Sequence, residues 1–147
     1  MRYWQHALIL AAALMLAAPL SAAAQPPDLL GTWKGTAQGV RIGPSHYRPA
    51  QGAGANFSDN AIEFTYVIKE QHGNRFAGES SSAKGKQTFV GAVQQDNRGG
   101  IILDNDGQYI FTLIDLGTID MCCSRQYPDN KLVACFRLRR ARNEPPE

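Results

Sequence analysis

The chain has 147 residues, with 15 basic and 13 acidic side chains and a formal net charge of +2. So small an excess of positive charge gives no global electrostatic reason to expect nucleic acid or an anionic membrane as a partner. Hydrophobic residues make up 44% of the chain, which is enough for one domain with its own core.

The first 24 residues have the three parts of a secretory signal peptide. Arg2 stands in a short basic leader, an apolar stretch follows, and Ala22 and Ala24 fit the −3 and −1 positions of a cleavage site. The apolar stretch is shorter than the roughly 20 residues of a membrane-spanning helix, and no later segment is apolar enough to span. We therefore expect a signal peptide over 1–24 and one exported domain over 25–147, in the periplasm or secreted.

Apolar and polar residues alternate over short runs from Leu29 to Arg139, and this pattern predicts strands and no helix. The clearest run covers 61–70, where Ile62, Phe64, Tyr66 and Ile68 share one face. Seven further strands are predicted at 29–37, 75–80, 88–94, 101–104, 108–115, 118–123 and 131–139.

Tight turns join most of these runs. The sequences His72 to Asn74 and Asn105 to Gly107 are typical of hairpin turns. About eight sequential strands joined in this way favour an all-β, up-and-down antiparallel barrel, which leaves no exposed sheet edge. A β-sandwich is the alternative. A barrel of eight strands is either filled by side chains or holds one small ligand.

One predicted connection is much longer than a hairpin needs. It runs from Gln38 to Asn60 and is rich in glycine and proline. Connections of this length are usually functional lids or disordered segments, and both remain open. Within it, His46, Tyr47 and Arg48 form a polar and aromatic cluster outside the strands.

Gly31-Thr32-Trp33, at the start of the first predicted strand, resembles the G-x-W motif of lipocalins and the first strand of avidin-type barrels. The resemblance, to a small calycin-type β-barrel, implies a tryptophan that plugs or lines the closed end. In lipocalins a basic residue of the last strand packs over this tryptophan, and Arg137 or Arg139 could serve here. The domain is short for a lipocalin and lacks its C-terminal helix. It also lacks the further tryptophans that surround biotin in avidins, so biotin is not the expected ligand.

The three cysteines fall on the last two predicted strands. Because side chains alternate along a strand, Cys122 and Cys135 point the same way across the hairpin, while Cys123 faces inward with Met121. We therefore predict a Cys122–Cys135 disulfide, consistent with an oxidising compartment, and a buried thiol at Cys123. The alternative pair, Cys123–Cys135, would need a bulge.

Catalytic machinery is not recognisable in the sequence. No histidine is placed to activate a cysteine, and Asp104 and Asp106 fit a hairpin turn better than a calcium loop. We therefore expect no enzyme activity, no metal site and no cofactor.

The function favoured by the sequence is binding of a small hydrophobic or amphipathic ligand inside the barrel. Inward tyrosines need hydrogen-bond partners, which a ligand could supply, and a ligand site implies a void of a few hundred cubic ångströms. The candidate ligand contacts are Trp33, Tyr66, Phe89, Tyr109 and Phe111.

A protein-binding module is the alternative function. A periplasmic inhibitor of a protease or lysozyme could insert either the segment 25–30 or the long connection into its target enzyme. Pull-down from a periplasmic extract would separate this function from small-ligand binding.

Overall fold

The computed structural model describes residues 25–43, 54–105 and 107–141, and within them every regular element is a strand. The expected signal peptide and the cluster of His46, Tyr47 and Arg48 lie outside the described residues. The strands are β1 (Gly31–Ile42), β2 (Asn56–Phe57), β3 (Ile62–His72), β4 (Arg75–Ser82), β5 (Gly85–Val93), β6 (Gly99–Asp104), β7 (Gln108–Asp115), β8 (Thr118–Gln126) and β9 (Lys131–Arg140).

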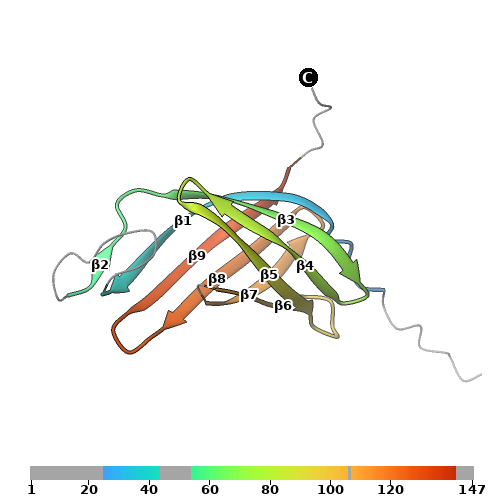
Figure 1. The fold of residues 1–147 in the computed structure, drawn as a ribbon. Helices are drawn as coiled ribbons and strands as arrows, with labels where there is room; N and C mark the ends of the chain where they lie inside the picture. The colour runs from blue at the N-terminus through green and yellow to red at the C-terminus, as the bar shows by residue number, and fades with distance from the viewer. Residues whose placement is uncertain (1–24, 44–53, 106, 142–147) are drawn as a thin grey trace, which may run out of the picture.

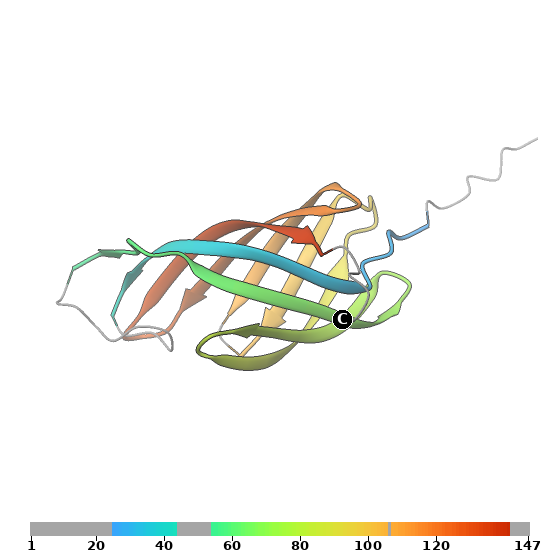
Figure 2. The ribbon, with the colours of Figure 1, turned by 90° about the horizontal axis from the view of Figure 1, so that it is seen from above.

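Eight of these strands close into an antiparallel barrel. From β3 to β9 each strand pairs with the next in sequence, β1 pairs with β3, and β9 returns to pair with β1 (Figures 1 and 2). The short strand β2 adds to β1 outside the ring, through Val40 and Phe57. The predicted up-and-down barrel is confirmed, and the sandwich alternative is wrong.

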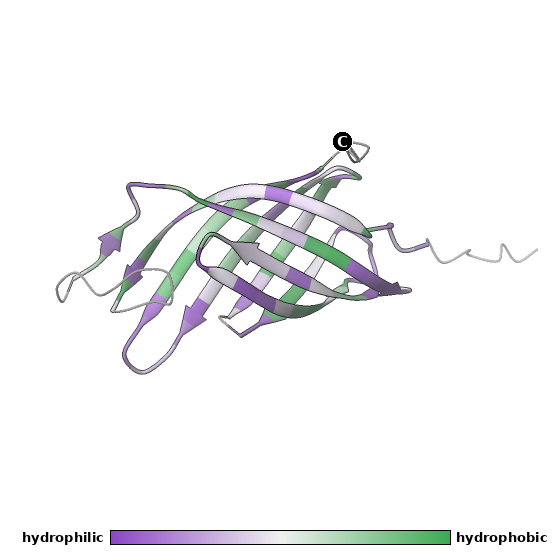
Figure 3. Cartoon of the chain, turned by 45° about the horizontal axis from the view of Figure 1, so that its top comes forward, coloured by the Kyte–Doolittle hydropathy of each residue, from purple (hydrophilic) through white to green (hydrophobic). Residues whose placement is uncertain are grey.

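Side chains alternate between the barrel interior and the solvent along each strand, so that hydrophobic and hydrophilic residues also alternate (Figure 3). Tyr66 and Ile68 of β3 are buried, whereas Glu63 and Lys69 are exposed. This two-residue period is what the sequence pattern predicted for each main strand.

The long predicted connection from Gln38 to Asn60 is wrong at its start, whereas its end agrees with the beginning of β3 at Ile62. Strand β1 continues to Ile42, paired with β9 as far as Lys131, and β2 lies inside the predicted connection. Strand β8 likewise continues beyond Cys123 to Gln126. In both places the partner strand supplies the hydrogen bonds, although the local sequence reads as a loop.

One end of the barrel is sealed by the segment that precedes β1. Leu29 is 2% exposed and Trp33 is fully buried, and the indole Nε1 donates a hydrogen bond to the Leu29 carbonyl at 2.9 Å. Gln71, near the end of β3, accepts a bond from the Leu29 amide and donates one to the Pro27 carbonyl, each at 2.8 Å. The segment 25–30, suggested above as a probe for a target enzyme, is thus already held against the base of the barrel.

Arg140 packs over Trp33, with its guanidinium carbon 4.6 Å from the centre of the indole ring. The expectation of Arg137 or Arg139 in this position is wrong. Trp33 pairs with Arg140 in the register between β1 and β9, and Arg137 and Arg139 face outward. The predicted kind of contact is present, but it comes from the neighbouring residue.

The predicted disulfide joins Cys122 and Cys135, which are direct partners in the register between β8 and β9. Cys123 faces the interior and is 7% exposed. The predicted pairing and the predicted faces are both confirmed. No helix in the described part of the chain is long and apolar enough to cross a membrane.

Candidate functional site

The barrel has a cavity at the end opposite Trp33. The C-terminal ends of β1 and β8, the N-terminal end of β9 and the short strand β2 lie at this end, on the left of Figure 1. The cavity holds about 70 Å³ of free space. Its described walls are formed by Ala37, Gln38, Gly39, Arg41, Ser58, Ile62, Phe64, Tyr66, Tyr109, Cys123, Arg125, Leu132, Ala134 and Phe136.

Aromatic rings form the floor of this cavity. The rings of Phe64 and Phe136 stack with their centres 6.0 Å apart, and Tyr66 lies 6.4 Å from Phe64 and 6.5 Å from Phe136. Tyr66 is 2% exposed and also meets the ring of Tyr109 edge-on. This group of rings separates the cavity from the tightly packed half of the barrel that contains Trp33, called the lower half below.

Small residues create the hollow above the floor. In the strand register Ala134 of β9 lies between Gly39 of β1 and Cys123 of β8, and all three line the cavity. A Cβ atom on Gly39 would come within 2.8 Å of the Val133 carbonyl oxygen and 2.9 Å of the Ala134 Cβ. The cavity therefore exists because neighbouring strands carry small inward side chains at the same level.

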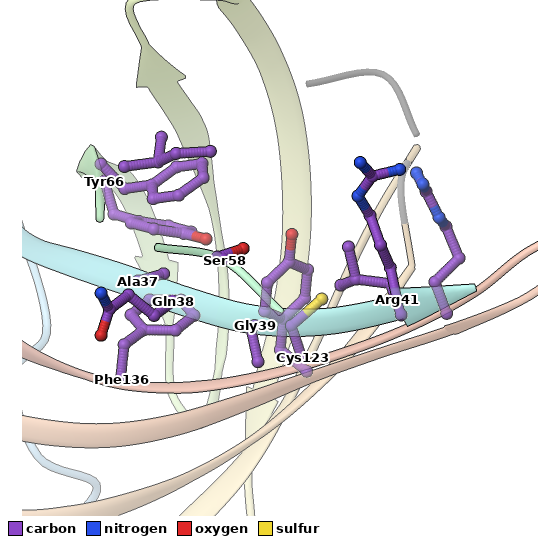
Figure 4. Close-up of a pocket in the computed structure, with 14 residues that line it drawn as sticks. Ala37, Gln38, Gly39, Arg41, Ser58, Tyr66, Cys123 and Phe136 are labelled. Atoms are coloured by element: carbon purple, nitrogen blue, oxygen red, sulfur yellow. The ribbon is translucent and has the colours of Figure 1, made fainter. Parts of the chain in front are cut away.

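Two arginines face inward at the mouth of the cavity. They lie two residues along their strands from Gly39 and Cys123, on the side away from the aromatic floor. Leu132 of β9 pairs with Arg41 on one side and with Arg125 on the other. Arg41 is 6% exposed, and its Nη1 donates a hydrogen bond to the Gly43 carbonyl at 2.8 Å. Figure 4 shows Arg41 at one end of the cavity and the rings of Tyr66 and Phe136 at the other. The site thus runs from a cationic mouth to an aromatic floor.

The phenol of Tyr109 is held by a carboxylate beside the cavity. Its hydroxyl donates a hydrogen bond to Asp104 Oδ2 at 2.8 Å, and Asp104 Oδ1 accepts one from the Gly107 amide at 3.0 Å. Burial, followed by the influence of Tyr66, Cys123 and Asp104, raises the pKa of Tyr109 far above its usual value. Tyr109 therefore contributes a neutral hydroxyl to the wall throughout the physiological pH range.

The geometry offers no nucleophile with an activating base among the described residues. The thiol of Cys123 lines the cavity, but His72 lies at the far end of β3, beyond the residues of that strand that form the wall. In the described ranges, no cluster of His, Cys, Asp and Glu is suited to hold a metal ion. The cavity offers apolar contact at its floor and two positively charged side chains at its mouth.

Of the five candidate ligand contacts, the structure brings two to the cavity. Tyr66 and Tyr109 form part of its wall. Phe89 and Phe111 instead pack against Phe76 in the filled lower half, with ring centres 6.4 and 6.0 Å away. Trp33 is buried at the sealed end.

Sequence reasoning missed the two arginines at the mouth. Both lie in segments that the sequence predicts as loops, although the period-two alternation from Trp33 continues to Arg41 and the alternation from Met121 continues to Arg125. Continuing the alternation of inward and outward side chains beyond the predicted end of each strand would have identified both arginines as inward-facing.

Comparison with known proteins adds little to this picture. No protein-family model matches the chain, and no curated protein matches it. Among solved structures, the chain is similar to the S-type phycobiliprotein lyase CPES from Guillardia theta. The two share 8% sequence identity over 79% of this chain and 90% of that one, with a TM-score of 0.37. A similarity this low carries no argument about function, which must come from the site itself.

Proposed function

We propose that this protein binds a small hydrophobic or amphipathic molecule in the cavity at the open end of its barrel. The observation that carries the proposal is the contrast between the two ends. Trp33, Leu29 and Arg140 fill and seal one end, whereas small residues leave the other end hollow above an aromatic floor. Concave apolar sites with a few polar groups at their rim are typical of small-molecule binding.

The size of the cavity restricts its ligand. Its free space of about 70 Å³ is well below the few hundred cubic ångströms expected from the sequence. A space of this size suits a short aliphatic chain or a small ring with the remainder of the molecule at the mouth. A larger ligand would require the rings of Phe64 and Phe136, which form part of the floor, to move. Both side chains are only partly buried.

A cavity-filling variant tests the proposal. Ala134→Leu places a larger side chain at the level where the wall is made of small residues, and should abolish the fluorescence increase of the apolar probe N-phenyl-1-naphthylamine on binding. Ala92→Leu, on the outer face of β5, is the matched control and should bind the probe as the unaltered protein does. Circular dichroism checks that both variants are folded. Full binding by a folded Ala134→Leu protein would overturn the proposal.

We also propose that the domain works in the periplasm or outside the cell. The Cys122–Cys135 disulfide is compatible with such a location, because disulfides persist mainly in oxidising compartments. N-terminal sequencing of the exported protein should give Gln25 as its first residue. An intact leader on protein recovered from its native host would contradict this.

A protein-binding role is the second candidate, and one surface feature favours it. Val90, Ile101, Leu103 and Ile110 lie on the outer faces of β5, β6 and β7 and are 44–59% exposed. Val90 pairs with Leu103 and Ile101 with Ile110, so the four side chains form a continuous apolar patch. Pull-down from a periplasmic extract, with Ile101→Lys as the control bait, tests whether a protein binds there. Equal recovery of any partner by both baits would reject this role for the patch.

A further inference from the structure

The charged side chains in the described wall of the cavity lie at its mouth, and both are positive. Arg41 and Arg125 are the only side chains charged at neutral pH among its described wall residues. Asp104 lies beside the wall, where its carboxylate accepts hydrogen bonds from the Tyr109 hydroxyl and from the Gly107 amide. Both charged side chains of the described wall are thus cations, and both lie at the mouth of the cavity.

The strand register brings these two arginines to the same level of the barrel. Both pair with Leu132, from opposite sides, and all three side chains face inward. Neighbouring strands are about 4.8 Å apart, so the Cα atoms of the two arginines are separated by about 10 Å. Arginine side chains are long enough for both guanidinium groups to reach one small group placed above Leu132.

Arg41 is unusual because its charge is almost completely removed from solvent, with 6% of the residue exposed. Burying a charge is unfavourable unless hydrogen bonds or an opposite charge compensate it. The bond from Nη1 to the Gly43 carbonyl is one such compensation and also fixes the direction of the guanidinium plane. A planar guanidinium group matches the two oxygens of a carboxylate better than a single polar atom.

The levels below the arginines suit an apolar group. The next inward level consists of Gly39, Ala134 and Cys123, and beneath it lie the rings of Phe136, Phe64 and Tyr66. Each level is separated from the next by two residues of strand, or about 6.7 Å. The distance from the arginines to the ring of Phe136 is thus comparable to the length of a short aliphatic chain.

We propose that the ligand of this cavity is an amphipathic anion, with a carboxylate head held by Arg41 and Arg125 and a short apolar body lying between the small residues and the aromatic floor. This inference rests on the proposed binding function and adds the chemical class of the ligand. The neutral hydroxyl of Tyr109 borders the body of the ligand and carries no charge that would repel the head.

A series of probes with the same chain and different heads tests the inference on the unaltered protein. Octanoate, octan-1-ol and octylammonium are titrated into the ¹⁵N-labelled protein, and amide shifts give each dissociation constant and locate the site. Octanoate should bind roughly tenfold more tightly than octan-1-ol, because one charge-assisted contact is worth about that factor. Octylammonium should bind most weakly of the three.

Arginine variants then assign the effect. Arg41→Gln and Arg125→Gln should each lower the affinity for octanoate toward that for octan-1-ol and leave octan-1-ol binding unchanged. Arg139→Gln, on the outer face of β9, is the matched control and should behave as the unaltered protein. If Arg41→Gln does not fold, Arg125→Gln and the probe series still decide the question.

The outcomes separate this inference from the function on which it rests. Equal affinity of the unaltered protein for octanoate and octan-1-ol would overturn the anionic class and support the apolar cavity. Tighter binding of octylammonium would overturn the anionic class as well. Failure of all three probes to shift amides around the cavity would overturn both proposals.

Discussion

Arg140, near the end of β9, lies with its guanidinium carbon 4.6 Å from the centre of the Trp33 indole ring, and so joins the last strand of the barrel to the first. The same guanidinium donates hydrogen bonds to the carbonyls of Leu30 and Asp28. One side chain of β9 thus contacts both the first strand and the segment that seals the base of the barrel.

Replacing this arginine should therefore destabilise the barrel. Arg140→Met keeps most of the side-chain volume and removes the cation–π contact and both hydrogen bonds, so the free energy of unfolding should fall by about 1–3 kcal/mol. Urea denaturation measures the change. The control is Arg139→Met, whose side chain faces outward and should change the stability by less than about 0.5 kcal/mol. Equal effects of the two substitutions would show that Arg140 has no special role.

Trp33 is fully buried at the same end, and its indole Nε1 donates to the Leu29 carbonyl. Trp33→Ala should lower the free energy of unfolding by about 3–5 kcal/mol, the usual cost of emptying a large buried aromatic site. Thermal or urea unfolding followed by circular dichroism checks this value. Ligand binding in the folded fraction should persist, because Trp33 is not part of the cavity wall. A loss below about 1 kcal/mol would contradict the role of Trp33 as the plug.

Trp33 was predicted from the sequence as the buried plug, whereas its partner Arg140 was not, and the reason lies in how a barrel is built. Trp33 was recognisable because its neighbouring glycines and its place at the start of a strand are local features. The choice of Arg140 over Arg137 and Arg139 depends on how β9 pairs with β1, more than 90 residues earlier in the chain. Local alternation gives the face of each side chain but not the residue on the partner strand that it meets.

The same distinction explains the candidate site. Tyr66 and Tyr109 were predicted to face inward, and they do, because each lies in a clear alternating run. The hollow above them depends on three small residues that meet across three strands, and no single strand shows this. Arg41 and Arg125 were missed because glycine-rich or turn-like sequence surrounds each of them, although long-range pairing extends their strands.

The cysteines give a third prediction. Cys135→Ser should remove the bridge to Cys122 and lower the free energy of unfolding by about 2–5 kcal/mol. Cys123→Ser should keep the bridge, because Cys123 faces the interior and takes no part in it. Non-reducing peptide mapping after cleavage at Arg125 and Lys131 checks which cysteines are linked. Fragmentation must locate the linked sulfur, since Cys122 and Cys123 share one peptide, and a link from Cys123 to Cys135 would contradict the register.

Gly91 of β5 provides a fourth prediction, from the packing of the lower core. A Cβ atom at this position would lie 2.3 Å from Cζ of the Phe76 ring, so Gly91→Ala forces the ring to move. Such overpacking should cost about 1–3 kcal/mol in urea denaturation. Gly54→Ala is the control, because a Cβ there meets no atom within 4 Å. The double variant Gly91→Ala, Phe76→Leu should lose less stability than the two single changes added together, and strict additivity would show that the ring is not the obstacle.

The last prediction concerns the dependence of stability on pH. Burial raises the pKa of Tyr109 far above its usual value of 10.0, so the folded protein keeps this proton under conditions in which the unfolded chain loses it. Stability that depends on the neutral phenol is therefore fully present below about pH 10 and falls as the pH rises above that value, because ionisation then favours the unfolded chain.

Tyr109→Phe removes the titrating group together with the hydrogen bond to Asp104, so the variant should be less stable at pH 7 and lose less stability between pH 9 and 11. Urea denaturation at a series of pH values gives both quantities for the two proteins. Tyr127→Phe, the same substitution at an exposed tyrosine, is measured beside it as the control. Parallel pH profiles for the unaltered protein and Tyr109→Phe would show that the phenol of Tyr109 ionises as readily in the folded state as in the unfolded chain.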